Sequence, residues 1–503
     1  MCAADLRARR RTFLGAALAV PLVSRFPLVH ASGAGPLADA PAGRFLGAHI
    51  DGVGRFLGIR YGQDTAATRF RPPVAARREA DAVRAWTHGP VSPQRGKLPG
   101  TQGEDCLRLN LWTPSIDPRA RRPVMVYIHG GAYHTGSGNE AWSEGAKLAA
   151  RGDVVVVTLT HRLNAFGYLS LGRLDARFPD SGNAGQLDLV LALQWIRDNI
   201  AAFGGDPRQV TLFGQSGGGA KIATLMAMPA AQGLFHRAIT MSGQQVTASG
   251  PLNATRRAQA YLAKLSRDPV AAPIEKLVEA LDAVDPILGG GVYFGPVLDG
   301  RTLTRHPFYP DAHPLGRSIP MMLGNTVAET RAFFPSSHRV FQGLDWTNLA
   351  ERLGPELRVD IAPEHVIERY REWFPNASPA EVFIRATTAG RSWRGQIIEA
   401  EERARAGVPA YVYQLDFDNA MHTDDIGLAF GTAPDMSSAK RALSDTMMDV
   451  FLRFAKTGDP GWPAYDLPAR KTMVFDRESR VVEDPRGRER ELFATVPYIQ
   501  PGT

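Results

Sequence analysis

Cysteine is nearly absent from this sequence of 503 residues, which contains only Cys2 and Cys106. Cys2 falls in an expected leader peptide, so the mature chain would keep a single thiol and form no internal disulfide. Cys106 lies in the strand-like run 105–111, which favours a buried, inert thiol over a nucleophile. A Cys–His metal site is therefore excluded, and we expect no metal and no cofactor.

The sequence also lacks a long apolar run. No stretch approaches 18 uninterrupted apolar residues, which predicts that the chain has no transmembrane helix. Hydrophobic residues make up 44% of the sequence and charged residues 22%, as in ordinary globular proteins. Because the sequence shows no internal repeat and no flexible linker, we expect a single domain over residues 33–503.

Positive charge is in small excess and gathers at the N-terminus. The formal net charge is +7, and residues 1–31 hold five arginines against one aspartate, which leaves +3 for the rest of the chain. That remainder gives no support to a nucleic-acid partner. Arg10 and Arg11, the apolar run 15–23 and the small-residue cleavage site 29–31 have the form of a twin-arginine signal peptide. We therefore predict a cleaved leader over residues 1–31 and a periplasmic or secreted protein.

Strand-like runs alternate with helical segments along the chain. The runs 124–128, 154–159 and 209–212 are almost wholly apolar or β-branched, as expected of strands buried on both faces. An amphipathic helix is expected over 187–203. Further strands are expected at 238–241, 320–323, 411–415 and 473–475. This alternation predicts an α/β fold with a large, mostly parallel central sheet flanked by helices.

Residues 252–406 are richer in helical patterns than the rest of the chain. Ser378 and Glu381 form a capping box with proline at the first helical position, so a helix is expected to begin there. Helical insertions between the late strands of such a sheet often cover an active site, and we expect the same arrangement here.

Ser216 lies in the most informative motif of the chain. Residues 214–218 read G-x-S-x-G, and they come directly after the strand-like run 209–212 and before a helical pattern. A strand, a tight turn and a helix in this order predict a nucleophile elbow, in which the serine side chain projects above the sheet edge. Gly214 and Gly218 fit this turn because a Cβ at either position would collide with it.

A serine hydroxyl is a good nucleophile only when a base takes its proton and an acid orients that base. His422 is the predicted base because it lies in the loop just after the strand at 411–415. Glu329 is the predicted acid because it follows the strand at 320–323 and would emerge at the carboxyl end of the sheet, where ligands bind in open α/β sheets. Asp299 is the second candidate for the acid.

A tetrahedral intermediate also needs N–H donors for its oxyanion. Residues 129–133 follow the strand at 124–128 and have a glycine-rich form that lets backbone N–H groups face a substrate oxygen. The N–H of Gly217, at the start of the helix after the serine, would add a further donor with the helix dipole behind it.

Together these motifs resemble the type B carboxylesterase family, which includes para-nitrobenzyl esterases and cholinesterase-like proteins with the α/β-hydrolase fold. The likeness extends over residues 56–465, most of the mature chain. Besides the elbow, its specific markers are residues 104–110, 129–132 and 199–207.

The resemblance implies hydrolysis of a small-molecule carboxylic ester through an acyl-serine intermediate. It also implies that Ser216 is the nucleophile, Glu329 the acid and His422 the base. The oxyanion-hole donors that it implies are the N–H groups of Gly131, Ala132 and Gly217.

This chain departs from the family at four positions. Cys106 lacks the partner that it would have in disulfide-bearing relatives. Gly217 replaces a frequent alanine, and Thr330 replaces the glycine that usually follows the acid. Gln215 stands where many relatives carry glutamate, which removes a negative charge beside the serine and disfavours choline-like, cationic substrates.

Two other readings stay open at this point. The same triad would serve a lipase or an amidase, and a non-catalytic adhesion or binding protein exists among cholinesterase relatives, although such proteins typically lose the serine. Lys221, Arg331 and His134 would favour an ester that carries carboxylates, but solvated surface charges are the simpler interpretation. The sequence does not indicate an oligomeric state.

Overall fold

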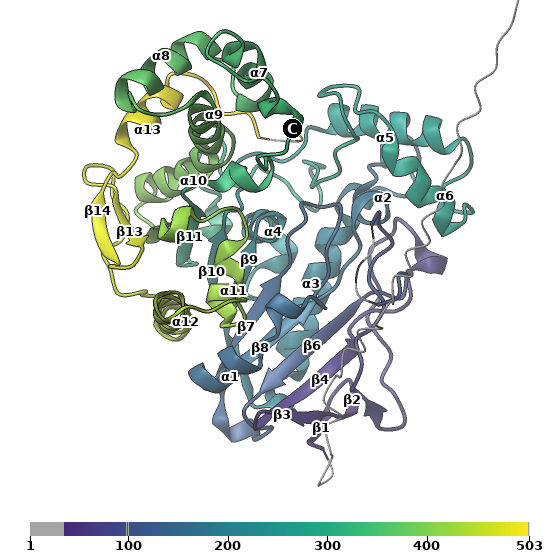
Figure 1. Ribbon diagram of the computed structural model, residues 1–503. Coiled ribbons are helices and arrows are strands. Elements are labelled where there is room, and N and C mark those ends of the chain that lie inside the picture. The colour runs from purple at the N-terminus through teal and green to yellow at the C-terminus, as the bar shows by residue number, and fades with distance from the viewer. Residues whose placement is uncertain (1–34, 97, 99, 501, 503) are drawn as a thin grey trace, which may run out of the picture. The chain divides into compact units, whose positions relative to one another are not determined.

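The computed structural model describes residues 35–96, 98, 100–500 and 502 (Figure 1). The predicted leader over residues 1–31 lies outside the described residues, so the leader and the export that it implies stay predictions. From Gly35 onward the described residues group into one compact unit.

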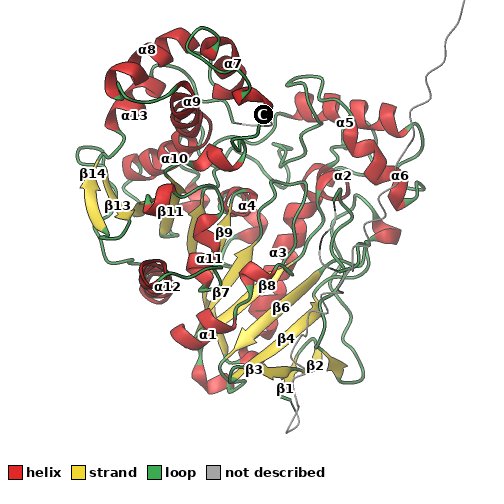
Figure 2. Ribbon diagram, viewed as in Figure 1, coloured by secondary structure: helices red, strands yellow, loops and turns green. Residues whose placement is uncertain are grey.

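The described strands form one large and one small sheet (Figure 2). The strands are β1 (Leu37–Ala40), β2 (Gly43–Leu46), β3 (Ala48–Ile50), β4 (Val53–Arg60), β5 (Val83–Arg84), β6 (Arg108–Thr113), β7 (Arg122–Ile128), β8 (Val155–Leu159), β9 (Gly205–Gln215), β10 (Arg237–Met241), β11 (Met321–Thr326), β12 (Ala410–Leu415), β13 (Lys471–Phe475) and β14 (Arg480–Glu483). The small sheet has the order β1-β2-β5. The large sheet has 11 strands in the order β14-β13-β12-β11-β10-β9-β7-β8-β6-β4-β3.

The large sheet is parallel at its centre and antiparallel at its ends. From β8 through β7, β9, β10, β11 and β12 to β13, each strand is parallel to its neighbour. The remaining pairs, β13 with β14 and β8 through β6 and β4 to β3, are antiparallel. All the strands predicted from the sequence are present, which confirms the mostly parallel sheet.

Helices surround the sheet and fill the connections between its strands (Figure 2). They are α1 (Ala146–Gly152), α2 (Asn164–Tyr168), α3 (Ala184–Asn199), α4 (Gly217–Leu225), α5 (Pro251–Leu265), α6 (Ile274–Glu279), α7 (Leu349–Leu357), α8 (Pro363–Trp373), α9 (Pro379–Thr387), α10 (Arg394–Arg405), α11 (Asp424–Phe430), α12 (Ser438–Thr457) and α13 (Gly487–Ala494). None of the helices in these described ranges is both long enough and apolar enough to cross a membrane.

The sheet separates two hydrophobic cores because successive side chains of a strand point to opposite faces. In β7, Val124, Val126 and Ile128 belong to one core, together with residues of α3, α4 and α10. Met125 and Tyr127 belong to the other core, with residues of α1, α11 and α12. A strand that is apolar at every position is therefore buried on both faces, as its composition predicted.

Two helical insertions interrupt the late part of the sheet. Helices α5 and α6 lie between β10 and β11, and α7 to α10 lie between β11 and β12; both groups appear in the upper part of Figure 1. The capping box at Ser378 is present at the start of α9, with its hydroxyl accepting from the N–H of Glu381. A π-helix, Thr388–Trp393, joins α9 to α10.

Three local expectations need correction. Cys106 precedes β6 rather than lying within it, although the thiol is free and fully buried, and burial raises its pKa. The helix expected over 187–203 is α3 followed by a 3-10 turn, Ile200–Phe203, because Gly204 adopts a left-handed conformation that ends it. Strand β11 continues to Thr326, beyond the end expected at residue 323.

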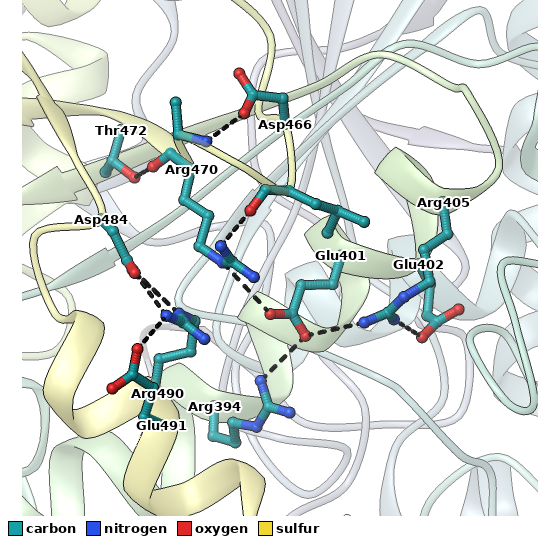
Figure 3. Close-up of polar contacts among 12 residues, drawn as sticks. Arg394, Glu401, Glu402, Arg405, Asp466, Arg470, Thr472, Asp484, Arg490 and Glu491 are labelled. Carbon is teal, nitrogen blue, oxygen red and sulfur yellow. Dashed lines mark hydrogen bonds and ion pairs between the residues drawn. The ribbon is translucent and has the colours of Figure 1, made fainter.

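A charged network fastens the edge of the sheet to the C-terminal helix (Figure 3). Glu401 of α10, whose side chain is 7% exposed, lies 3.7 Å from Arg405 and 3.9 Å from Arg470, which directly precedes β13. Arg490 of α13 pairs with Asp484, directly after β14, at 2.7 Å. The network thus joins α10 and α13 to the β13–β14 hairpin.

A second ion pair is almost fully buried. The guanidinium of Arg162, which follows β8, donates to both carboxylate oxygens of Asp188 in α3 at 2.6 and 2.8 Å. The backbone N–H of Arg162 also donates to Asp188 at 3.0 Å. Because both side chains are almost fully excluded from water, each charge depends on the other.

Asp188→Asn should lower the free energy of unfolding by about 3–5 kcal/mol, because it leaves the buried charge of Arg162 without a counterion. Urea unfolding measures this change. Asp198→Asn, in the half-exposed Arg197–Asp198 pair of the same helix, is the matched control and should change stability by less than about 1 kcal/mol. Equal effects in the two variants would contradict the structural role of the buried pair.

Candidate active site

The carboxyl ends of neighbouring parallel strands lie level at one edge of the sheet. Strand β9 pairs with β10 as far as Gln215 and Met241, and β10 pairs with β11 as far as Met241 and Gly324. The segments that follow parallel strands therefore meet at this edge, where ligands bind in open α/β sheets. The predicted nucleophile, acid and base follow β9, β11 and β12, so the fold brings them together.

Ser216 occupies a strained turn between β9 and α4. Its φ and ψ are 55° and −126°, and its N–H donates to the carbonyl of Met241 at 2.7 Å. A Cβ on Gly214 would lie 2.7 Å from the carbonyl oxygen of Ile128, and one on Gly218 would lie 1.9 Å from the same oxygen. Only glycine fits these two positions. The Ser216 side chain is half-buried, and its hydroxyl has no hydrogen-bond partner among the described residues.

Glu329 and His422 form a buried pair beside this turn. The Nδ1 atom of His422 is hydrogen-bonded to Oε1 of Glu329. The other oxygen, Oε2, accepts from the hydroxyl of Ser242 at 2.9 Å and from the N–H of Thr326 at 3.2 Å. Glu329 is fully buried and His422 is 9% exposed, so the carboxylate fixes the imidazole with the proton on Nδ1 and leaves Nε2 unprotonated.

The pair shifts the pKa values of its two members in opposite directions. Burial alone would raise the pKa of Glu329, but the facing His422 and the donors at Oε2 outweigh burial and lower it. Burial alone would lower the pKa of His422, but Glu329 outweighs it and raises that pKa above its ordinary value. The imidazole is thus a stronger base than a free histidine.

Gln215 contacts the imidazole directly. Its side-chain Nε2 lies 3.2 Å from Nε2 and 3.3 Å from Nδ1 of His422. Because Nδ1 donates to Glu329, Nε2 of the ring is the acceptor that the amide faces. The glutamine packs against the base without adding a negative charge to the site.

Ser216 and His422 line a cavity of about 550 Å³. The glycine-rich loop after β7 also reaches this cavity through Gly131 and Ala132, and Gly217 lines it from the start of α4. The N–H groups of Gly131, Ala132 and Gly217 donate to no residue in the part of the chain that the structure describes. Free backbone donors beside a serine are the groups that stabilise an oxyanion.

The structure accommodates two of the four departures from the family pattern, Gly217 and Thr330. A Cβ on Gly217 would lie 2.1 Å from the carbonyl oxygen of Ala132, so glycine lets the loop approach the elbow more closely than alanine would. The hydroxyl of Thr330 lies 2.8 Å from that of Thr387 and 3.0 Å from that of Thr388. Thr330 therefore anchors the turn of Glu329 to the second insertion.

Asp299, the second candidate for the acid, lies elsewhere. Its carboxylate caps the following turn by accepting from the N–H groups of Arg301, Thr302 and Leu303 at 2.9 to 3.0 Å. It does not line the cavity. Across the described ranges, no three or more His, Cys, Asp and Glu side chains gather in a way that could hold a metal ion.

The three polar residues considered for substrate binding lie in three different surroundings. Lys221 is fully buried, with its ammonium donating to the carbonyl of His129 at 3.0 Å, and burial lowers its pKa to about 7. The Lys221 ammonium therefore does not lie on the surface. Its hydrogen bond to His129 supports the glycine-rich loop. Arg331 is exposed and lines a separate cavity of about 710 Å³ beside His422. Burial lowers the pKa of His134 to about 4, which keeps its ring neutral.

The cavity is also lined by residues that no sequence motif indicated. Tyr293 comes from the first insertion, Arg358 and Arg391 come from the second, and Gln500 comes from the C-terminal segment. These residues lie far apart in the sequence, and no spacing rule joins them to the elbow.

Comparisons with known proteins identify the family and agree with the fold. A sequence profile described as the carboxylesterase family matches residues 34–486. Para-nitrobenzyl esterase of Bacillus subtilis is 31% identical over 89% of this chain and 96% of its own length. Carboxylesterase 1C of Rattus norvegicus is 28% identical over 86% of this chain and 88% of its own. The structure of a Geobacillus stearothermophilus carboxylesterase matches with a TM-score of 0.82 and 33% identity, covering 91% of this chain and 99% of that chain.

Gly218→Ala should lower the free energy of unfolding by about 1–3 kcal/mol, because the new methyl group would overlap the carbonyl oxygen of Ile128. Gly291→Ala is the control, since a Cβ at that position meets nothing within 4 Å. Chemical denaturation of the two variants measures the difference. A Gly218→Ala protein as stable as the control would show that the elbow is not tightly packed.

Proposed function

This chain belongs to the carboxylesterase family, and on that premise we propose that it hydrolyses carboxylic esters with Ser216, Glu329 and His422. The observation that carries the proposal is the buried Glu329–His422 pair beside a serine that lines the same cavity as His422. A serine, an oriented imidazole and free N–H donors are the parts that acyl transfer requires.

In the proposed mechanism, the Ser216 hydroxyl attacks the ester carbonyl while Nε2 of His422 takes its proton. Glu329 holds the proton on Nδ1, which keeps the correct tautomer and stabilises the imidazolium that forms. The imidazolium then protonates the leaving alcohol, and an acyl-serine remains. Water, activated by the same imidazole, hydrolyses the acyl-serine and restores the hydroxyl.

We assign the oxyanion hole to the N–H groups of Gly131, Ala132 and Gly217. They line the cavity and have no other partner among the described residues. In such sites the loss of one donor costs about 10²–10³ in kcat. Lys221 supports this arrangement by holding the carbonyl of His129, directly before the loop.

We also propose that the enzyme acts outside the cytoplasm, in the periplasm or as a secreted protein. The support for this part of the proposal is the twin-arginine form of the sequence before residue 31. Removal of that segment during export would leave every residue of the site in place.

Ser216→Ala should lower kcat for para-nitrophenyl butyrate by about 10⁵- to 10⁶-fold, because no other group can form the acyl intermediate. The fold should survive, since the hydroxyl has no hydrogen-bond partner among the described residues. Ser336→Ala, at an exposed serine of the neighbouring cavity, should retain activity within about twofold of wild type. Unchanged ester hydrolysis by Ser216→Ala would contradict the proposed mechanism.

Glu329→Gln should shift the acid limb of the kcat/KM pH profile to lower pH and reduce the plateau by about 10⁴-fold. The base must be neutral to work, so activity falls as the pH drops through the pKa of His422. Removal of the carboxylate takes away the charge that raises this pKa. Glu368→Gln, at an exposed site on α8, should leave both the limb and the plateau in place. A shift to higher pH in Glu329→Gln would contradict the assignment.

A further inference from the structure

The wall of the active-site cavity carries positive charge and no negative charge. Arg358 and Arg391 both line the cavity that holds Ser216, and none of the described residues that line it is an aspartate or a glutamate. The acid of the triad lies behind His422, out of the cavity. A substrate bound here therefore meets two permanent cations.

Arg358 is held at the end of α7 with its charge unpaired. The residue ends the helix in a left-handed conformation, with φ 61° and ψ 23°, and it is half-buried. Its guanidinium makes no hydrogen bond and no ion pair with any residue that the structure describes. A guanidinium offers five N–H donors, so a partly buried one without a partner is unusual.

Arg391 is only partly neutralised. One of its nitrogens donates to Glu356 at 2.8 Å, and its guanidinium lies 5.6 Å from the centre of the Phe333 ring. Both guanidinium groups line the same cavity. Burial lowers the pKa of Arg391, and the charge of Arg358 lowers it further. Arg391 also lies on the π-helix between α9 and α10, and π-bulges are frequent at functional sites.

Two like charges at a cavity wall repel each other unless an anion lies between them. A carboxylate is well suited to this place, because a guanidinium binds its two oxygens through parallel N–H donors. The neutral Gln215 beside His422 adds no negative charge to the wall of the cavity. A cationic substrate would be repelled by the same wall.

We propose that Arg358 and Arg391 form an anion-binding subsite and that the preferred substrates are esters that also carry a carboxylate. This inference rests on the proposed esterase function and adds the class of substrate to it. The carboxylate binds between the two guanidinium groups while the ester carbonyl lies at Ser216. The carboxylate belongs either to the acyl part or to the alcohol part of the substrate, and the experiment below tests each position with its own pair of esters.

The test compares matched anionic and neutral esters by kcat/KM. Mono(para-nitrophenyl) adipate and its methyl ester place the charge on the acyl side; 4-acetoxybenzoate and its methyl ester place it on the alcohol side. Wild-type enzyme should prefer the anion by about tenfold or more in at least one arm, which is the value of one charge-assisted hydrogen bond. Arg358→Gln should bring that ratio close to one, mainly through KM, and Arg358→Lys should keep part of the preference.

Arg331→Gln is the matched control, because Arg331 lies near the same histidine but lines the other cavity; it should keep the wild-type ratio. Free adipate, which has no scissile bond, should inhibit competitively and bind more weakly to Arg358→Gln. A wild-type ratio of one or less in both arms, or a ratio that Arg358→Gln leaves unchanged, would overturn the subsite alone. Failure of wild-type enzyme to cleave any of the four esters would instead overturn the esterase function.

Discussion

The close contact between the Ser216 turn and the ends of the neighbouring strands is the constraint on which the site depends. The Gly218 backbone lies so near the carbonyl of Ile128 that a single methyl group would not fit, and the N–H of Ser216 is bound to Met241. One turn is therefore fixed against β7 on one side and β10 on the other. The strain at Ser216 persists because the packed backbone around it leaves no alternative conformation. The position of the proposed nucleophile is thereby tied to the loop that would hold the oxyanion.

The burial of Glu329, the proposed acid, is the second constraint. A fully buried carboxylate keeps its charge only where donors surround it, and Glu329 has His422, Ser242 and Thr326 as partners. These partners come from three different strand ends, so the charge of the acid depends on the sheet register. Thr330 extends the coupling outward, since its hydroxyl bonds join the turn of the acid to the second insertion. The turn that carries Glu329 is therefore bonded to the second insertion.

The sequence predicted the sheet and the proposed nucleophile, acid and base because their positions follow from local rules, whereas the three proposed oxyanion-hole donors were assigned from the resemblance to the family. Parallel strands place their carboxyl ends together, so a residue just after a buried strand can be located without further knowledge. The insertions obey no such rule: whether Arg358 or Arg331 faces the cavity depends on how α7 to α10 pack, which is a long-range property. Lys221 shows the same limit, because a lysine in a helix is usually exposed, whereas α4 is buried on all sides here.

The division between sheet and insertions has a consequence for how specificity arises. The proposed nucleophile, acid and base lie at strand ends, where a change in backbone position would disturb all of them at once. Arg358 and Arg391 lie on the second insertion, outside the strands, so their charges can differ without moving the serine. An elbow glutamate would set a negative charge beside the base and oppose an anionic ligand, whereas Gln215 contributes none. The neutral elbow and the cationic wall thus act in the same direction, although they come from separate parts of the chain.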